Sequence, residues 1–172
     1  RKKLEEILDQ KQKNLEAIFD AVPVGMLLVD ENMKVVRVND AIRQMVRSDY
    51  PQIVNLRIGS SLRCINSTYS QKGCGYSPVC AECELRKTVE SALSEGVSVQ
   101  KVEIQPTLRV ANKEITPWFC ISAEPVVIDG RKHAVIAIDD ITNRKNAEEK
   151  LKETMEIKSQ FISTVSHELR TP

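Results

Sequence analysis

Features that define several classes of protein are missing from this sequence. No apolar run approaches the length of a membrane-spanning helix, and no stretch resembles a signal peptide. The formal net charge is only +1, far from the strong basic surplus that a dedicated nucleic-acid-binding protein carries. We therefore expect no nucleic acid among the partners of this chain.

Glycine is absent from both ends of the chain, where the pattern favours long helices. Within residues 1–22, positions spaced alternately by four and three form a narrow seam that is apolar except at Lys11: Leu4, Leu8, Lys11, Leu15, Ile18 and Val22. A second such seam, polar at Lys158, follows Ile141: Leu151, Met155, Lys158, Ile162, Val165 and Leu169. Both patterns predict coiled-coil-type helices that join two copies in a homodimer. The first helix could instead be an amphipathic cap on its own domain.

Between these helices the period of the apolar residues changes to that of strands. Alternating apolar residues predict five strands, two early and three late: 26–30, 35–39, 97–110, 115–128 and 132–141. A short helix is expected at 41–48 and a longer one at 84–96, and Asp129-Gly130 predicts a hairpin turn. This order indicates an α+β fold, a five-stranded antiparallel sheet with helices packed on one face.

Four of the five cysteines fall between residues 64 and 83, with the spacing C-x9-C-x5-C-x2-C. Cys80 and Cys83 form a chelating pair, and Cys83 lies where a helix begins, which favours a thiolate. Gly73 and Gly75 flank Cys74 and permit the sharp turns that a ligand loop needs. The thiolates of Cys64, Cys74, Cys80 and Cys83 would complete a tetrahedral all-cysteine metal site.

Three stretches resemble the sensor histidine kinases of two-component systems. Residues 20–42, DAVPVGMLLVDENMKVVRVNDAI, are similar to the start of a PAS domain, and residues 137–153, AIDDITNRKNAEEKLKE, resemble its end. Residues 161–172, FISTVSHELRTP, are similar to the H-box of the kinase dimerisation domain. The resemblance implies a PAS sensor domain at 14–142. A signalling helix at 1–22 precedes it, and a helix at 143–172 runs into a truncated dimerisation domain.

The H-box resemblance implies a role for each matching residue. His167 would be the phosphoacceptor, which attacks the γ-phosphate of ATP and passes the phosphoryl group to an aspartate of a response regulator. Glu168 would be the general base, and Thr171 would help to orient water for phosphatase activity. Asp140 and Thr142 would carry a signal from the last strand into the helix.

The chain contains no glycine-rich phosphate loop and no asparagine-bearing nucleotide box. ATP is therefore expected to act only in a longer protein, and the chain by itself is expected to be inactive as a kinase. The sequence begins with arginine and ends inside the H-box, so we read it as a fragment. The sequence leaves open whether a membrane anchor lies upstream.

The H-box also implies a compartment for the cysteines, because it must meet ATP and a response regulator in the cytoplasm. Structural disulfides are rare there, so a metal or a reversible thiol switch is favoured. Zinc, an iron–sulfur cluster and metal-free thiols all stay open. Cys120 is expected to pack, and a small molecule could occupy the PAS pocket. An alternative is a PAS dimerisation module with a purely structural zinc and no sensed ligand.

Overall fold

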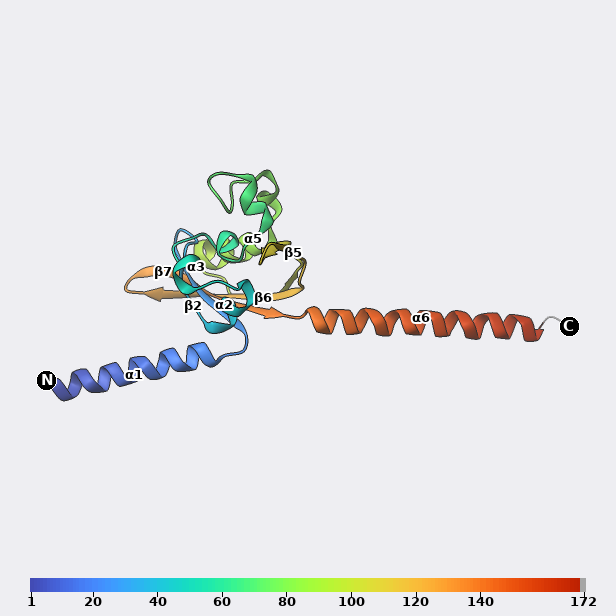
Figure 1. Cartoon of the computed structure of the whole chain (residues 1–172), viewed down its shortest axis with the longest axis horizontal. Helices are drawn as coiled ribbons and strands as arrows, with labels where there is room; N and C mark the ends of the chain where they lie inside the picture. The colour runs from blue at the N-terminus through green and yellow to red at the C-terminus, as the bar shows by residue number, and fades with distance from the viewer. Residues whose placement is uncertain (171–172) are drawn as a thin grey trace. The chain divides into compact units, whose positions relative to one another are not determined.

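The computed structural model describes residues 1–170 and divides into two compact units, one ending at Asp140 and the other beginning at Ile141. The first unit is built on a five-stranded sheet with the strand order β2-β1-β7-β6-β3, all neighbours antiparallel (Figure 1). The strands are β1 (Gly25–Asp30), β2 (Val35–Val38), β3 (Val99–Ile104), β6 (Phe119–Ile128) and β7 (Arg131–Asp140). The predicted fold class is confirmed.

The helical layer covers one face of this sheet. Its elements are α2 (Asp40–Val46), α3 (Tyr50–Ile53), α4 (Ile58–Ser61), η1 (Ile65–Tyr69), η2 (Pro78–Glu82), α5 (Glu84–Glu90) and the π-helical turn η3 (Ser91–Glu95). Alternate residues of each strand point to one face, so Leu27, Ile121 and Ile136 are fully buried against the helices. Leu85, Val89 and Leu93 join the same core, as their shared helical face predicts.

The third predicted strand, 97–110, is divided in the structure. Only β3 joins the main sheet, whereas β4 (Leu108–Val110) pairs with β5 (Lys113–Ile115) in a separate two-stranded sheet. Pro106, between β3 and β4, has no backbone N–H to give to a sheet. The β4–β5 turn uses Ala111 and Asn112 at positive φ, a backbone that the alternation of apolar residues does not reveal.

Two long helices frame the sheet in sequence, α1 (Lys2–Ala21) in the first unit and α6 (Thr142–Arg170) in the second. Neither contains a buried residue, and the apolar side chains of both predicted seams are exposed within the single chain, as at Leu8 and Met155, except for half-buried Val22 just after α1. Among residues 1–170, no helix has both the length and the apolar character needed to cross a membrane.

Candidate functional site

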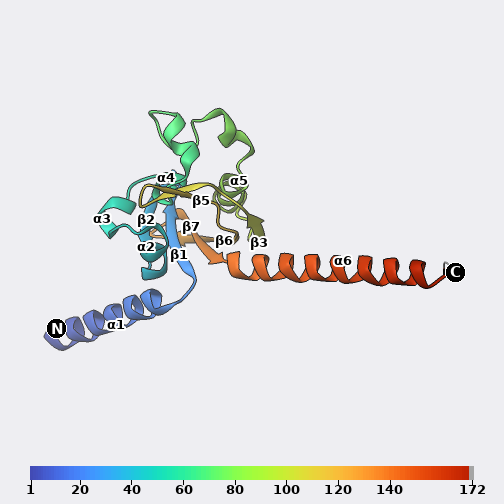
Figure 2. The same ribbon diagram turned by 45° about the vertical axis from the view of Figure 1, so that its right-hand side comes forward.

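Residues 64–83, the cysteine segment, connect α4 to α5. In Figures 1 and 2 this green segment forms a lobe on the helical side of the sheet. Gly73 and Gly75 adopt φ values of +83° and +93°, so both glycines beside Cys74 take the left-handed backbone that the sequence predicts. Cys83 is the N-cap residue of α5, also as predicted.

All four cysteines of this segment line one cavity of about 470 Å³. Its other walls include Leu62, Leu85 and Phe119, so the cavity reaches from the cysteine segment into the core of the domain. Cys80 is buried, and the other three thiols are half-buried. The structure therefore brings together the four residues that the spacing singled out.

Gly59 of α4 makes the close approach of two of these thiols possible. A β-carbon on Gly59 would lie 2.5 Å from Cys74 Sγ and 3.7 Å from Cys64 Cβ. The neighbouring Ser60 Oγ accepts a hydrogen bond from the Cys74 N–H at 3.1 Å, and the Cys64 N–H donates to the Gly59 carbonyl at 2.8 Å. Gly59 was not predictable from the sequence, because nothing in the cysteine spacing indicates which helix packs against the segment.

Burial in the cavity makes two of its thiols, Cys64 and Cys74, weaker acids. Burial raises the pKa of Cys64, and the backbone N–H groups of Asn66 and Ser67 oppose that shift only in part. Burial also raises the pKa of Cys74, against smaller opposing contributions from the Gly59 backbone and the Arg57 guanidinium, and electrostatic repulsion from the groups of Cys80 and Cys83 adds to the rise at both sites. The thiols are thus close enough to interact electrostatically.

All five cysteines are free thiols in this structure. Within the described range 1–170, no three or more His, Cys, Asp or Glu side chains form a group that could hold a metal ion. The shared cavity brings the four thiols together without a ligation geometry, and the predicted zinc or iron–sulfur centre stays a prediction. Cys120 lies on the other face of the sheet, because its neighbours Phe119 and Ile121 point into the core.

The raised pKa values predict how two thiols respond to pH. In the metal-free folded chain, alkylation of Cys64 and Cys74 by iodoacetamide should be slow at neutral pH, because only the thiolate reacts. Its rate should keep rising above the ordinary thiol pKa of about 8.5. Site-resolved mass spectrometry over a pH series measures this, with the unfolded chain as reference. A folded-state rate that levels off together with the unfolded one would contradict the prediction.

The predicted phosphotransfer residues lie in the second unit. His167 and Glu168 are exposed near the end of α6, Thr142 is the first residue of that helix, and Asp140 ends β7 in the first unit. Thr171 lies outside the described residues. The roles of all five stay predictions.

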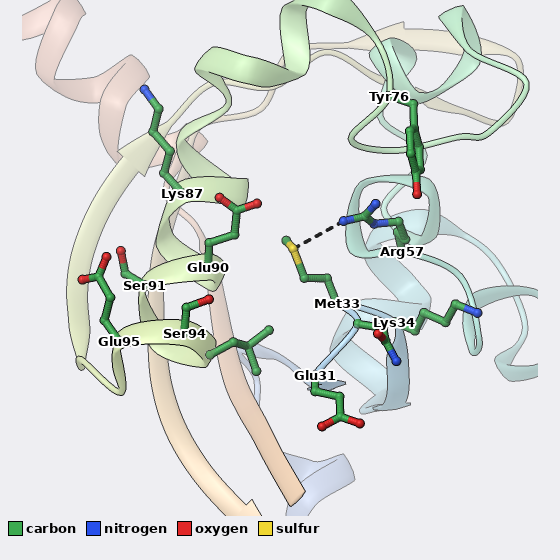
Figure 3. A pocket seen from close by; sticks show the side chains of 12 residues that line it. Glu31, Met33, Lys34, Arg57, Tyr76, Lys87, Glu90, Ser91, Ser94 and Glu95 are labelled. Carbon is green, nitrogen blue, oxygen red and sulfur yellow. Dashed lines mark hydrogen bonds between the residues drawn. The ribbon is translucent and has the colours of Figure 1, made fainter.

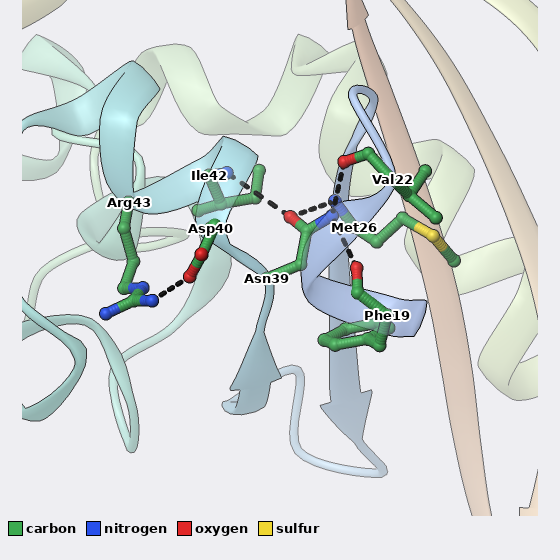
Figure 4. Close-up of polar contacts among 7 residues, drawn as sticks. All are labelled: Phe19, Val22, Met26, Asn39, Asp40, Ile42 and Arg43. Carbon is green, nitrogen blue, oxygen red and sulfur yellow. Dashed lines mark hydrogen bonds and ion pairs between the residues drawn. The ribbon is translucent and has the colours of Figure 1, made fainter. Parts of the chain in front are cut away.

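Two further features were missed by the sequence analysis. Asn39, expected at the end of a strand, is instead the fully buried N-cap of α2 and bonds to the last turn of α1 and to the segment that joins α1 to β1 (Figure 4). An asparagine just before a helix is a recognised N-cap signal. The second is a polar cavity of about 810 Å³ that contains Arg57 and Tyr76 (Figure 3). No sequence pattern indicated it, because its walls come from segments far apart in the chain.

Comparisons with known proteins agree with this architecture. A family model described as a PAS domain matches residues 13–76, which include Cys64 and Cys74 but not Cys80 and Cys83. The crystal structure of a PAS domain of an HTR-like protein from Haloarcula marismortui is 15% identical, with a TM-score of 0.56 over 82% of this chain and 100% of that one. The fold is that of a PAS domain.

Other PAS domains are similar to the same degree. One from a Colwellia psychrerythraea protein is 16% identical, with a TM-score of 0.55 over 80% of this chain and 98% of that chain. Another, from a two-component sensor histidine kinase, is 11% identical, with a TM-score of 0.50 over 77% and 97%. A search of curated proteins finds no match. The PAS prediction is confirmed, and at these identities the likeness is one of fold.

Proposed function

We propose that the chain is the sensory input part of a two-component histidine kinase, in which a thiol centre in the PAS domain controls phosphorylation of His167. The observation that carries this proposal is the convergence of Cys64, Cys74, Cys80 and Cys83 on one cavity that reaches the core of a PAS domain. A likeness to the PAS domain of a sensor histidine kinase and the H-box sequence around His167 support the kinase part.

The donor set fits a soft metal centre. Thiolates select zinc or iron–sulfur clusters, and four of them on a short segment can satisfy a tetrahedral ion or a cluster. The absence of a β-carbon at Gly59 leaves Cys74 and Cys64 free to lie close together. A bound metal would supply either a structural crosslink or a redox centre. The chain itself would position the thiols and exclude water from the cavity.

Signal transfer in this proposal runs through the sheet. β7 lies at the centre of the sheet, between β1 and β6, and ends at Asp140, directly before α6 begins at Thr142. A change in the thiol cavity that moves the sheet would therefore reach α6 through a single intervening residue, Ile141. Two pre-existing states biased by the centre suffice for such control.

The protein acts in the cytoplasm in this proposal, as a homodimer with a response regulator as its partner. The exposed apolar seams of α1 and α6 favour pairing with a second copy, because neither helix has a buried residue within the described residues of the single chain. ATP would bind to another part of a longer protein. The response regulator would receive the phosphoryl group from His167, with Glu168 as general base.

Anaerobic purification with metal analysis and a visible spectrum tests the centre. We expect iron with a coloured cluster or colourless zinc, lost in the Cys80→Ser/Cys83→Ser double variant and kept in Cys120→Ser, whose thiol lies outside the cavity. Equal metal content in the double variant and the wild type would contradict a cysteine-ligated centre. In the longer kinase, acid-labile label from ATP should disappear in His167→Gln, and the double variant should change its amount. Colourless zinc with unchanged labelling would favour the structural-zinc alternative.

A further inference from the structure

None of the four thiols lines the polar cavity of about 810 Å³, which lies between the β1–β2 turn and the α5–η3 stretch. Figure 3 shows Arg57 and Tyr76 on one side of it, and Glu90, Ser91 and Glu95 on the opposite side. Buried Met33 and Leu93 add apolar surface to its lining. The cavity therefore offers separate cationic, acidic and apolar surfaces.

Arg57 is the unusual member of this lining. Its side chain is half-buried, and its Nε is buried with no hydrogen-bond partner. Its guanidinium lies 5.2 Å from the centre of the Tyr76 ring, and Nη2 is 3.6 Å from the sulfur of Met33. Among residues 1–170, no carboxylate forms an ion pair with it. A half-buried cation that has no carboxylate partner and is not fully hydrated is costly, and a ligand anion would satisfy it.

The other charged side chains that line the cavity are either paired with an opposite charge or exposed. Glu90 accepts from Arg86 at 2.6 Å, and Lys87 lies 2.8 Å from Glu82 and 3.4 Å from Glu84. Glu31, Glu95 and Lys34 are exposed. The cavity thus combines one half-buried cation that lacks a carboxylate partner with two exposed carboxylates. This arrangement favours a ligand that is negative at its inner end and positive at its outer end.

We propose that this cavity binds a small zwitterion, of which an α-amino acid is the simplest, through a carboxylate–guanidinium pair with Arg57. The ligand ammonium group faces Glu31 and Glu95, and its apolar part lies against Met33 and Leu93. A guanidinium suits this role because it matches a carboxylate with two parallel hydrogen bonds. The inference rests on the proposed sensory role, but not on the thiol centre.

Calorimetric titration of the whole chain with three matched probes tests the charge requirement. L-leucine carries both charges, 4-methylpentanoate only the carboxylate, and 3-methylbutylamine only the ammonium group. We expect L-leucine to bind most tightly, 4-methylpentanoate more weakly, and the amine not at all. Absence of binding by L-leucine, or binding by the amine alone, would overturn the proposal. Equal affinity for L-leucine and 4-methylpentanoate would overturn its zwitterion part.

Substitutions inside and outside the cavity test where L-leucine binds. Arg57→Gln should raise the Kd for L-leucine about tenfold or more, as expected for loss of a charged hydrogen-bonded pair. Arg109→Gln, which removes an arginine paired with Glu114 outside this cavity, should leave the Kd unchanged. Ser94→Trp fills the cavity from an exposed position and should abolish binding without touching Arg57. An unchanged Kd in both Arg57→Gln and Ser94→Trp would refute the site.

One further variant separates this inference from the thiol centre. The Cys80→Ser/Cys83→Ser chain should bind L-leucine as the wild type does, because neither cysteine lines the Arg57 cavity. Binding that persists after the metal is lost supports the Arg57 site on its own. Loss of L-leucine binding in this variant, with the fold intact by circular dichroism, would show that the site depends on the thiols and would contradict its independence.

Discussion

Replacing Asn39 by alanine is expected to lower the free energy of unfolding by about 2–4 kcal/mol, since it leaves buried backbone groups without partners and removes a helix cap. Asn39 is fully buried. Its Oδ1 accepts from the N–H groups of Met26 at 2.9 Å and Ile42 at 3.3 Å. Its amide Nδ2 faces three carbonyl oxygens, those of Phe19 at 3.2 Å and Val22 at 3.3 Å (Figure 4) and that of Val24 at 2.9 Å.

Through these hydrogen bonds, Asn39 connects α1, β1 and α2. Aspartate has nearly the same shape and keeps the two accepting positions, but it places negative charge against three carbonyl oxygens. We therefore expect Asn39→Asp to be at least as destabilising as the alanine variant at neutral pH, so shape alone does not rescue the site. This requirement for a donor is what distinguishes asparagine from aspartate, the common N-cap residue of the same shape.

Urea unfolding, followed by circular dichroism, measures the difference. Asn32→Ala is the matched control, because Asn32 is exposed in the β1–β2 turn and should change stability by less than about 0.5 kcal/mol. Limited proteolysis gives a second readout, since loss of the Nδ2 contacts should make residues 19–24 easier to cleave. Equal unfolding midpoints for Asn39→Ala and Asn32→Ala would show that the network contributes no stability.

Asn39 also shows where sequence patterns stop being informative. The alternation through β2 placed the strand correctly, because one buried face imposes a period of two, but it carried the strand one residue too far. Strand β1, helix α5 and the Asp129-Gly130 turn were predictable for similar local reasons: each signal lies within a few consecutive residues. The β4–β5 hairpin was not, since Ala111 and Asn112 lack the glycine that marks such a turn.

In the candidate site, too, some features could be predicted from the sequence and others could not. Clustering of the thiols follows from the short segment that carries Cys64, Cys74, Cys80 and Cys83, so their shared cavity could be expected. Gly59 and Arg57 could not, because their importance depends on packing between segments that local spacing does not describe. Arg57 reads as an ordinary surface arginine in the sequence, and only its half-burial without an ion pair distinguishes it.

Replacing Gly59 by alanine is expected to disturb the thiol site much more than the rest of the fold. The new β-carbon would lie 2.5 Å from Cys74 Sγ and 3.2 Å from Cys74 Cβ, so the cysteine must move. Alanine is the better helix former, and Gly59 does not have the positive φ that would strain it. Any loss of stability, which we expect to be about 1–3 kcal/mol, therefore comes from the clash.

Gly25→Ala is the matched control, because it crowds the same core away from the thiols. Its β-carbon would lie 2.6 Å from Ile42 Cδ1 and 3.1 Å from the Ile138 carbonyl oxygen. Both variants should unfold more easily than the wild type. Only Gly59→Ala should weaken metal retention, by about 10- to 100-fold as for other groups that support metal ligands, and should speed alkylation of Cys74 in the metal-free chain.

The pair of variants separates crowding of the core from displacement of one thiol. If metal affinity falls equally in Gly25→Ala and Gly59→Ala, retention follows overall stability, and the position of Cys74 has no special part in it. If it is unchanged in Gly59→Ala while Cys74 alkylation accelerates, Cys74 is displaced without loss of metal and is not a ligand. The proposed centre requires a loss confined to Gly59→Ala, because all four thiols must reach one ion or cluster from fixed positions on the cysteine segment.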